Sequence, residues 1–149
     1  MTTSVKHSII INSYNRPKFI KQALESVSAQ SNPDFEAIIA DDGSNQETLS
    51  VIEKAASMDP RIRLLPCPDL IPDQDRGKCA TRYPGRINDA LKVCSGRIIH
   101  YLADDDYYPI DRLRTFDELF STPTIMAGYG RLIYVGRDRE KTGERFPYG

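Results

Sequence analysis

The sequence contains very few of the residues that bind transition metals or form disulfides. His7 and His100 are the only histidines among 149 residues. Both flank or lie within apolar stretches typical of strands, so we expect them to be structural. The three cysteines show no CxxC spacing, which argues against a disulfide framework and a zinc ribbon. A histidine-rich metal site is therefore excluded, and reduced thiols are expected.

Long apolar runs and excess charge are also absent. No stretch approaches the roughly 18 apolar residues of a membrane-spanning helix, and the N-terminal run SIIIN is too short for a signal peptide. The net charge of −1 gives no electrostatic attraction to nucleic acid or to an anionic membrane. We therefore expect a cytoplasmic protein with no transmembrane segment and no nucleic-acid partner, while peripheral membrane association stays open.

The sequence also lacks both common glycine-rich phosphate loops. Neither GxGxxG nor GxxxxGK[ST] occurs, which disfavours a dinucleotide dehydrogenase or a P-loop enzyme. The length, with 40% hydrophobic and 28% charged residues, is typical of one globular domain with a substantial core.

Strand-like and helix-like segments alternate along the chain. Buried strands are predicted at 8–13, 35–40, 61–65 and 98–103, and helices at 17–30, 46–57, 86–94 and 110–120. A long loop is predicted over 66–85, a strand or hairpin arm over 125–135, and no core pattern over 136–149. This alternation predicts an α/β fold with a mostly parallel sheet.

The stretch RIIHYLADDD, Arg97 to Asp106, ends a predicted strand in three carboxylates. Asp104, Asp105 and Asp106 repel one another, so we expect a cation to meet them. Mg²⁺ or Mn²⁺ suits such oxygen ligands. A solvated acidic turn is the alternative. The position favours a metal, because open α/β sheets bind ligands at the carboxyl ends of their strands.

Polar residues follow the first two predicted strands as well. They are Ser13-Tyr14-Asn15-Arg16 and Asp41-Asp42-Gly43-Ser44. Each set alone is as well explained by a turn or a helix cap. Together with the acidic strand end, they predict a crevice for a polar ligand whose anionic part is bound to a metal.

The residue types in this crevice suit a nucleoside diphosphate. Tyr14 can stack on a base, and Asp42 can accept a hydrogen bond from a base or a ribose. Arg76, Lys78 and Arg82, in or near the predicted long loop, can supply positive charge to a diphosphate.

Three segments resemble the family-two glycosyltransferases of the GT-A fold, and among them the glycosyltransferases of bacterial spore-coat polysaccharide. They are IIINSYNRPKFIKQALESVSAQ, FEAIIADDGSNQETLSVI and INDALKVCSGRIIHYLADDDYYPIDRL. The resemblance implies a Rossmann-like three-layer sandwich. It also implies inverting transfer of a sugar from a nucleotide-diphosphate donor, of the UDP type, to a saccharide or other hydroxyl acceptor in polysaccharide biosynthesis. Mn²⁺ or Mg²⁺ is the implied cofactor.

The resemblance also assigns roles to individual residues. It implies that Ser13 and Tyr14 surround the base and that Asp42 binds it. Asp104 lies near the ribose or phosphate, and Asp105 holds the metal. Because Ala103 stands at the first position of the usual DxD motif, Asp106 is expected to help Asp105. The remaining members of the predicted donor site are Asn15, Arg16, Arg76 and Arg82.

Enzymes of this family take a carboxylate base from a later, acceptor-binding half. No residue of this sequence matches that base by motif, so the catalytic residue is unassigned and the base is expected beyond Gly149. We therefore expect residues 1–149 to be a single nucleotide-sugar-binding domain, the donor half of an enzyme. An apolar face left bare by the other half would favour self-association, so a homo-oligomer is among the expected states.

Three alternatives stay open from the sequence. The chain could be a nucleotide-sugar-binding module or an inactive fragment that lacks the base. It could also be a nucleotidyl- or phosphoryl-transfer enzyme, although the usual glycine- and lysine-rich loop is absent. At the level of single residues, Tyr107 and Tyr108 could line a sugar pocket or pack under the next helix.

Overall fold

The computed structural model of the protein describes residues 6–67, 82–128, 132–135 and 141–145. The chain divides into two compact units, Met1–Arg114 and Thr115–Gly149. The prediction of a single domain over the whole chain stays a prediction.

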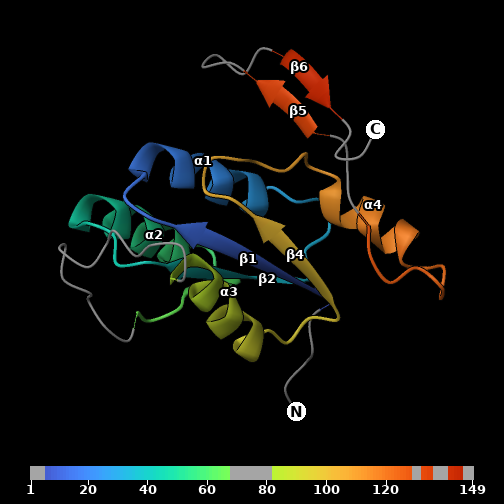
Figure 1. Ribbon diagram of the computed structural model, residues 1–149, viewed down its shortest axis with the longest axis horizontal. Helices are drawn as coiled ribbons and strands as arrows, with labels where there is room; N and C mark the ends of the chain where they lie inside the picture. Colours follow the sequence, from blue (N-terminus) through green and yellow to red (C-terminus); the bar gives the residue numbers. More distant parts are fainter. Residues whose placement is uncertain (1–5, 68–81, 129–131, 136–140, 146–149) are drawn as a thin grey trace. The chain divides into compact units, whose positions relative to one another are not determined.

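The first unit is built on a four-stranded sheet. Its strands are β1 (His7–Ser13), β2 (Phe35–Asp41), β3 (Ile62–Leu64) and β4 (Ile98–Leu102). All described neighbours pair in parallel, in the order β3-β2-β1-β4. The helices between them are α1 (Pro17–Ser28), α2 (Gln46–Met58) and α3 (Arg82–Val93), as Figure 1 shows. The parallel sheet expected from the sequence is confirmed.

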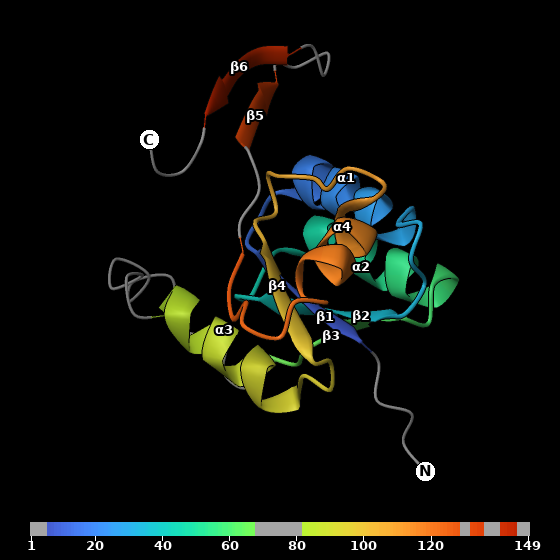
Figure 2. The same ribbon diagram turned by 90° about the vertical axis from the view of Figure 1, so that its right-hand side faces the viewer.

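Successive side chains of the strands point to opposite faces of the sheet and pack into two separate apolar clusters. On β1, Ile9 and Ile11 pack with the buried residues of α1 and α2, whereas Ile10 belongs to a second cluster with Ile38 and Ala90 of α3. Figure 2 shows α3 on the opposite side of the sheet from α1 and α2. The three-layer α/β sandwich is therefore confirmed.

Local sequence explains where α1 and α2 begin. Pro17 occupies the first turn of α1. An N–H at this position has no partner within the helix, so proline, which lacks it, costs nothing there. Asn45 caps α2, because its side-chain oxygen accepts from the Thr48 amide at 3.0 Å. The buried face of α1 has the expected helical spacing: Ile20, Ala23, Leu24 and Val27.

The two histidines lie in the core, side by side on neighbouring strands. His7 Nδ1 and His100 Nε2 are 2.9 Å apart, and the residues are 0% and 4% exposed. Each ring therefore satisfies a buried polar atom of the other, which agrees with the structural role expected of them.

Two expected boundaries were wrong by more than two residues. Helix α3 begins at Arg82, so residues 82–85 are helical and the loop predicted over 66–85 ends earlier. Pro84 hid this start, although proline is tolerated in the first turn of a helix. Residues 125–128 belong to no strand, contrary to the strand predicted over 125–135.

The second unit contains a hairpin that the sequence did not predict in full. β5 (Leu132–Val135) lies inside the strand or hairpin arm predicted over 125–135. It pairs antiparallel with β6 (Lys141–Arg145), which lies in the tail where no element was expected. The β6 sequence KTGER has no apolar residue, so no alternating pattern marks it. Helix α4 (Arg112–Leu119) runs from the end of the first unit into the second.

Candidate functional site

The carboxyl end of β1 turns sharply into α1 and presents polar groups at the sheet edge. Asn15 has a φ of 52°, a left-handed conformation that asparagine tolerates better than most residues. Its main-chain N–H donates to Ser44 Oγ at 3.0 Å, and its side-chain oxygen accepts from the Asn45 N–H at 2.7 Å. The turn after β1 is thus tied directly to the turn after β2.

Asp41 organises the turn after β2. Its buried carboxylate accepts from the Gly43 N–H at 3.0 Å, from the Ser44 N–H at 2.8 Å and from Ser44 Oγ at 2.5 Å. The Asp41 carboxylate therefore stabilises the turn after β2. Asp42, the predicted base-binding residue, is half-buried, and its N–H donates to the Ser13 carbonyl at 3.0 Å. This bond places Asp42 beside the end of β1.

Ser13 carries an unusual buried hydroxyl at this edge. The residue is 1% exposed, and its Oγ has no hydrogen-bond partner among the described residues. A buried hydroxyl normally has a partner, so this one is open to a hydrogen bond from a ligand or a water.

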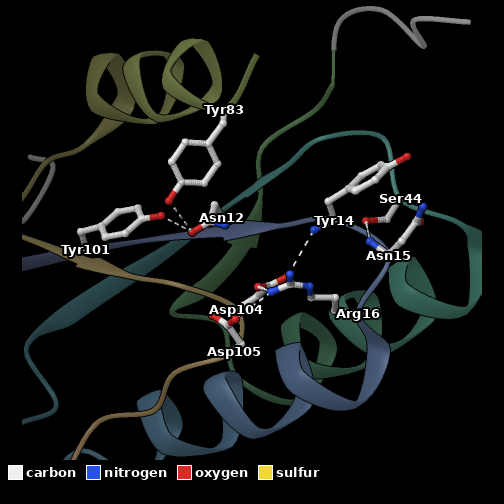
Figure 3. A network of polar contacts seen from close by, with 9 residues as sticks. All are labelled: Asn12, Tyr14, Asn15, Arg16, Ser44, Tyr83, Tyr101, Asp104 and Asp105. Atoms are coloured by element: carbon white, nitrogen blue, oxygen red, sulfur yellow. Dashed lines mark hydrogen bonds and ion pairs between the residues drawn. The ribbon is translucent and has the colours of Figure 1, made fainter. Parts of the chain in front are cut away.

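The acidic strand end is joined to β1 by Arg16. The Arg16 Nη1 atom lies 3.2 Å from Asp104 Oδ1 and 2.8 Å from Asp105 Oδ2. The Tyr14 N–H donates to Asp104 Oδ2 at 3.4 Å. Figure 3 shows these side chains meeting, with the Tyr14 ring extending away from the carboxylates. The structure therefore brings Tyr14, Arg16, Asp104 and Asp105 together, as the strand-end argument predicted.

The three aspartates differ in their surroundings. The Asp104 side chain is only 4% exposed, and burial raises its pKa, against the lowering effect of the Tyr14 amide and the Arg16 guanidinium. The Asp105 side chain is 49% exposed. Burial raises the pKa of Asp106, with a further contribution from the neighbouring charge of Asp105. Arg16 bonds to Asp104 and Asp105, and the role of Asp106 as a metal ligand stays a prediction.

The residues present fit one part of a Mg²⁺ or Mn²⁺ site. Asp104 and Asp105 direct one oxygen each to the same cationic nitrogen, so they can converge on one positive charge. Mg²⁺ is commonly bound through one or two carboxylates, with substrate phosphates and waters completing the shell. No group of three or more His, Cys, Asp or Glu within the described part of the chain could hold a metal alone. The two carboxylates therefore fit a metal site in which a diphosphate would supply the remaining ligands.

A pair of tyrosines beside this site was missed by the sequence argument. The hydroxyls of Tyr83 on α3 and Tyr101 on β4 both donate to the side-chain oxygen of Asn12, the former at 3.3 Å (Figure 3). Burial raises the pKa of Tyr83, and the charges of Asp104 and Asp105 raise it further. Tyr83 therefore lies within electrostatic reach of the acidic pair. No sequence motif relates these three residues, because they come from three separate elements.

Tyr108 is part of the core. It is 9% exposed, its hydroxyl donates to the Tyr101 carbonyl at 2.7 Å, and burial raises its pKa to about 12. The packing alternative is therefore correct for Tyr108, while Tyr107 is half-buried. Arg76 and Lys78 lie outside the described residues, as does the side chain of Arg82, so their predicted roles stay predictions.

Within the described residues, none of the helices combines the length and the apolar character that a membrane crossing requires.

Comparison with known proteins gives a consistent relationship. Protein CgeD of Bacillus subtilis is 40% identical over 139 residues, covering 91% of this chain and 32% of CgeD. Among solved structures, Staphylococcus aureus TarS 1–349 in complex with UDP-GlcNAc has a TM-score of 0.63 at 25% identity, covering 78% of this chain and 31% of that one. The chain thus spans about a third of the length of these relatives.

A third similarity concerns the fold. The mannosyltransferase PcManGT of Pyrobaculum calidifontis, solved with GDP-Man and Mn²⁺, has a TM-score of 0.66 at 22% identity, covering 93% of this chain and 38% of that one. The sequence model of the family "Glycosyl transferase family 2" matches residues 8–147 of the chain. With this match over nearly the whole chain, and with the three-layer sandwich and the acidic strand end already in place, the protein belongs to glycosyl transferase family 2.

Proposed function

We propose that the chain provides the donor site of a metal-dependent glycosyltransferase that transfers a sugar from a UDP-type nucleotide sugar to a hydroxyl acceptor. One observation carries the proposal: two carboxylates at the end of β4 converge on a single cationic group beside the ends of β1 and β2. Membership in the family supports sugar transfer, and the TarS complex with UDP-GlcNAc supports a UDP-type donor.

Each strand end would take a separate part of the donor. Ser13, Tyr14 and Asp42 would surround the base, since the Asp42 N–H is bonded to Ser13 and the Tyr14 ring extends away from the acidic pair. Asp104, close to the Tyr14 N–H, would lie near the ribose. Asn15 would hold the turn between these groups through its two bonds to the β2 turn.

The diphosphate would lie toward the acidic pair. Asp104 and Asp105, with Asp106 as the predicted helper, would hold Mg²⁺ or Mn²⁺, which supplies positive charge to the leaving diphosphate. Arg16 and the predicted Arg76 and Arg82 would bind the remaining phosphate oxygens.

The reaction breaks the bond between the anomeric carbon and the diphosphate oxygen, and the electron pair leaves with the nucleoside diphosphate. The acceptor oxygen forms the new bond from the opposite face, with inversion, and its proton passes to a carboxylate base. That base is not assigned to any residue of this chain.

Calorimetric titration of UDP tests the donor site. We expect UDP binding that requires Mn²⁺, and we expect Asp105→Asn to weaken it at least about tenfold through loss of a charged ligand. Glu25→Gln is the matched control, because it removes the same charge from the exposed Lys21–Glu25 pair on α1. Wild-type protein that binds no UDP with Mn²⁺, or equal binding by Asp105→Asn, contradicts the proposal.

Turnover tests whether the 149-residue chain acts as more than a binding module. A module binds UDP-sugar without releasing UDP, so released UDP is the quantity to measure. Sugar transfer to added acceptor by the 149-residue chain would contradict the prediction that the base lies beyond Gly149.

A further inference from the structure

The acidic pair at the end of β4 already holds a cation that belongs to the protein. Arg16 Nη1 lies within 3.2 Å of one carboxylate oxygen of Asp104 and one of Asp105. Its positive charge offsets the repulsion between two adjacent carboxylates, one of which is almost fully buried. The guanidinium therefore serves as the counter-ion of the acidic pair.

Arg16 and a divalent ion compete for the same two oxygens. A metal bound through Asp104 Oδ1 and Asp105 Oδ2 would share them with the guanidinium, and two cations at this spacing repel each other. Metal binding at these oxygens is therefore favoured when Arg16 moves away.

The structure allows that movement in the side chain alone. The Arg16 side chain is 50% exposed, so half of its surface faces solvent and its long stem can change rotamer on that side. Its backbone is fixed on both sides: Asn15 is bonded to the β2 turn, and the Ile20 N–H donates to the Arg16 carbonyl at 3.0 Å. Rotation of the long side chain moves the charge while the strand end keeps its geometry.

We propose that Arg16 is an exchangeable counter-ion: it neutralises Asp104 and Asp105 before a divalent cation binds, leaves them when that cation binds, and is then available to the diphosphate of the donor. This inference rests on the proposed donor site. It makes the free protein a poor metal binder and favours joint binding of metal and nucleotide, because the displaced guanidinium finds a new anion only when the diphosphate is present.

A purely structural ion pair makes a different prediction. If Arg16 only stabilises the strand end, its removal weakens metal and nucleotide binding together or changes neither. An exchangeable counter-ion gives effects of opposite sign, since its loss removes a competitor of the metal and also a ligand of the diphosphate.

Arg16→Gln tests the inference with two binding measurements that do not depend on turnover. Binding of Mn²⁺ alone, followed by electron paramagnetic resonance, is expected to tighten about fivefold, the size of one lost exposed ion pair. Binding of UDP at saturating Mn²⁺, followed by calorimetry, is expected to weaken about tenfold through loss of a charge-assisted hydrogen bond.

Arg63→Gln is the matched control. Arg63 is also half-exposed and ion-paired, to Glu36 at 3.2 Å, but it lies on β3 away from the acidic pair. We expect both affinities to stay at the wild-type level. Thermal unfolding of each variant establishes that it is folded under the binding conditions.

The outcomes separate this inference from the proposed function. If wild-type protein binds UDP with Mn²⁺ but Arg16→Gln leaves the affinity for Mn²⁺ alone unchanged or weaker, the exchange is wrong and the donor site stands. Tighter Mn²⁺ binding without weaker UDP binding also overturns it, because Arg16 then does not reach the diphosphate. Absence of UDP binding by wild-type protein, with Mn²⁺ present, overturns both.

Discussion

Arg86 Nε donates to the main-chain carbonyl of Asp41 at 2.9 Å, which ties helix α3 to the end of strand β2. The same buried guanidinium bonds through Nη2 to the carbonyls of Leu65 and Pro66, at 3.0 and 3.2 Å. A single side chain on α3 thus satisfies three carbonyls at the carboxyl ends of β2 and β3. One of these carbonyls belongs to Asp41, the residue immediately before Asp42.

We expect Arg86→Lys to lower the free energy of unfolding by about 2–3 kcal/mol. The lysine ammonium cannot span carbonyls that the planar guanidinium reaches together, and each buried carbonyl left unpaired costs about 1–3 kcal/mol. Urea denaturation measures the change. Arg114→Lys is the control. Arg114 is exposed, and its contact with Asp111 is long, at 3.8 Å, so its replacement should cost little. An equal effect of both changes contradicts the role of Arg86.

Ser13→Ala is expected to have opposite effects on stability and on donor binding. Removal of a buried hydroxyl that has no described partner should leave the free protein unchanged or more stable by about 0.5–1 kcal/mol. If Ser13 contacts the nucleoside, UDP binding weakens in the same variant. Urea denaturation and calorimetry provide the two values.

Ser8→Ala is the matched control for Ser13→Ala. Ser8 is equally buried on β1, but its hydroxyl donates to Glu36 at 2.6 Å. We expect a loss of about 1–3 kcal/mol in stability, because the bond is to a charged group. A destabilising Ser13→Ala with unchanged UDP affinity would show that the Ser13 hydroxyl serves the fold.

Gly43→Ala is expected to cost about 1–2 kcal/mol. Gly43 has a φ of 80°, where an L side chain is strained, and its N–H is held by Asp41. Gly85 offers the control: it lies within α3, with nothing within 4 Å of an added Cβ, so Gly85→Ala should stabilise by about 0.5–1 kcal/mol. Thermal unfolding of the two variants should shift in opposite directions, and a shared direction contradicts the strain at Gly43.

Glu36 should make part of the stability depend on pH. Burial alone raises the pKa of Glu36, but the hydrogen bonds from Ser8, Ser95 and Arg63 outweigh it and hold the pKa below 4.5. A carboxyl whose pKa is lowered by folding contributes stability that is complete above the unfolded value and is lost as pH falls through the folded value. The window therefore lies below about pH 4.5.

Glu36→Gln tests this window. At about pH 7 we expect a loss of about 1–3 kcal/mol, since hydrogen bonds to a charged acceptor are replaced by weaker ones. Below the window the wild-type carboxyl is protonated as well, so the difference between the two proteins should shrink. Urea denaturation over a pH series measures it, and a difference that is constant with pH would contradict the contribution of the Glu36 charge.

The sequence predicted the sheet well because the relevant signals are local. Ile9, Ile10 and Ile11 form a continuous apolar run of the kind that a parallel strand buried on both faces requires. The polar residues after each strand also indicated one edge, because successive parallel strands end on the same side. By contrast, β6 was missed because strand pairing through the backbone leaves no mark on a polar pentapeptide.

The sequence indicated which residues would meet at this sheet edge but not the contacts between them, and their roles in a donor site stay predictions. Asp104 and Asp105 stood out as a charge cluster, and Arg16 as a neighbour of the first strand. Which cation meets the acidic pair depends on a contact across 88 and 89 residues of sequence, so no local pattern could reveal it. The convergence of Tyr83 and Tyr101 on Asn12 was hidden for the same reason.

The sequence by itself therefore determined the parallel α/β fold, the sheet edge at which the polar strand ends meet and the types of group available there. These follow from the period of apolar residues and from the residues at each strand end. Only the tertiary structure decided that Asp41 holds its loop, that the Ser13 hydroxyl has no described partner and that Arg16 occupies the acidic pair. Such contacts depend on distances between separate strand ends, which packing of the sheet and its helices sets.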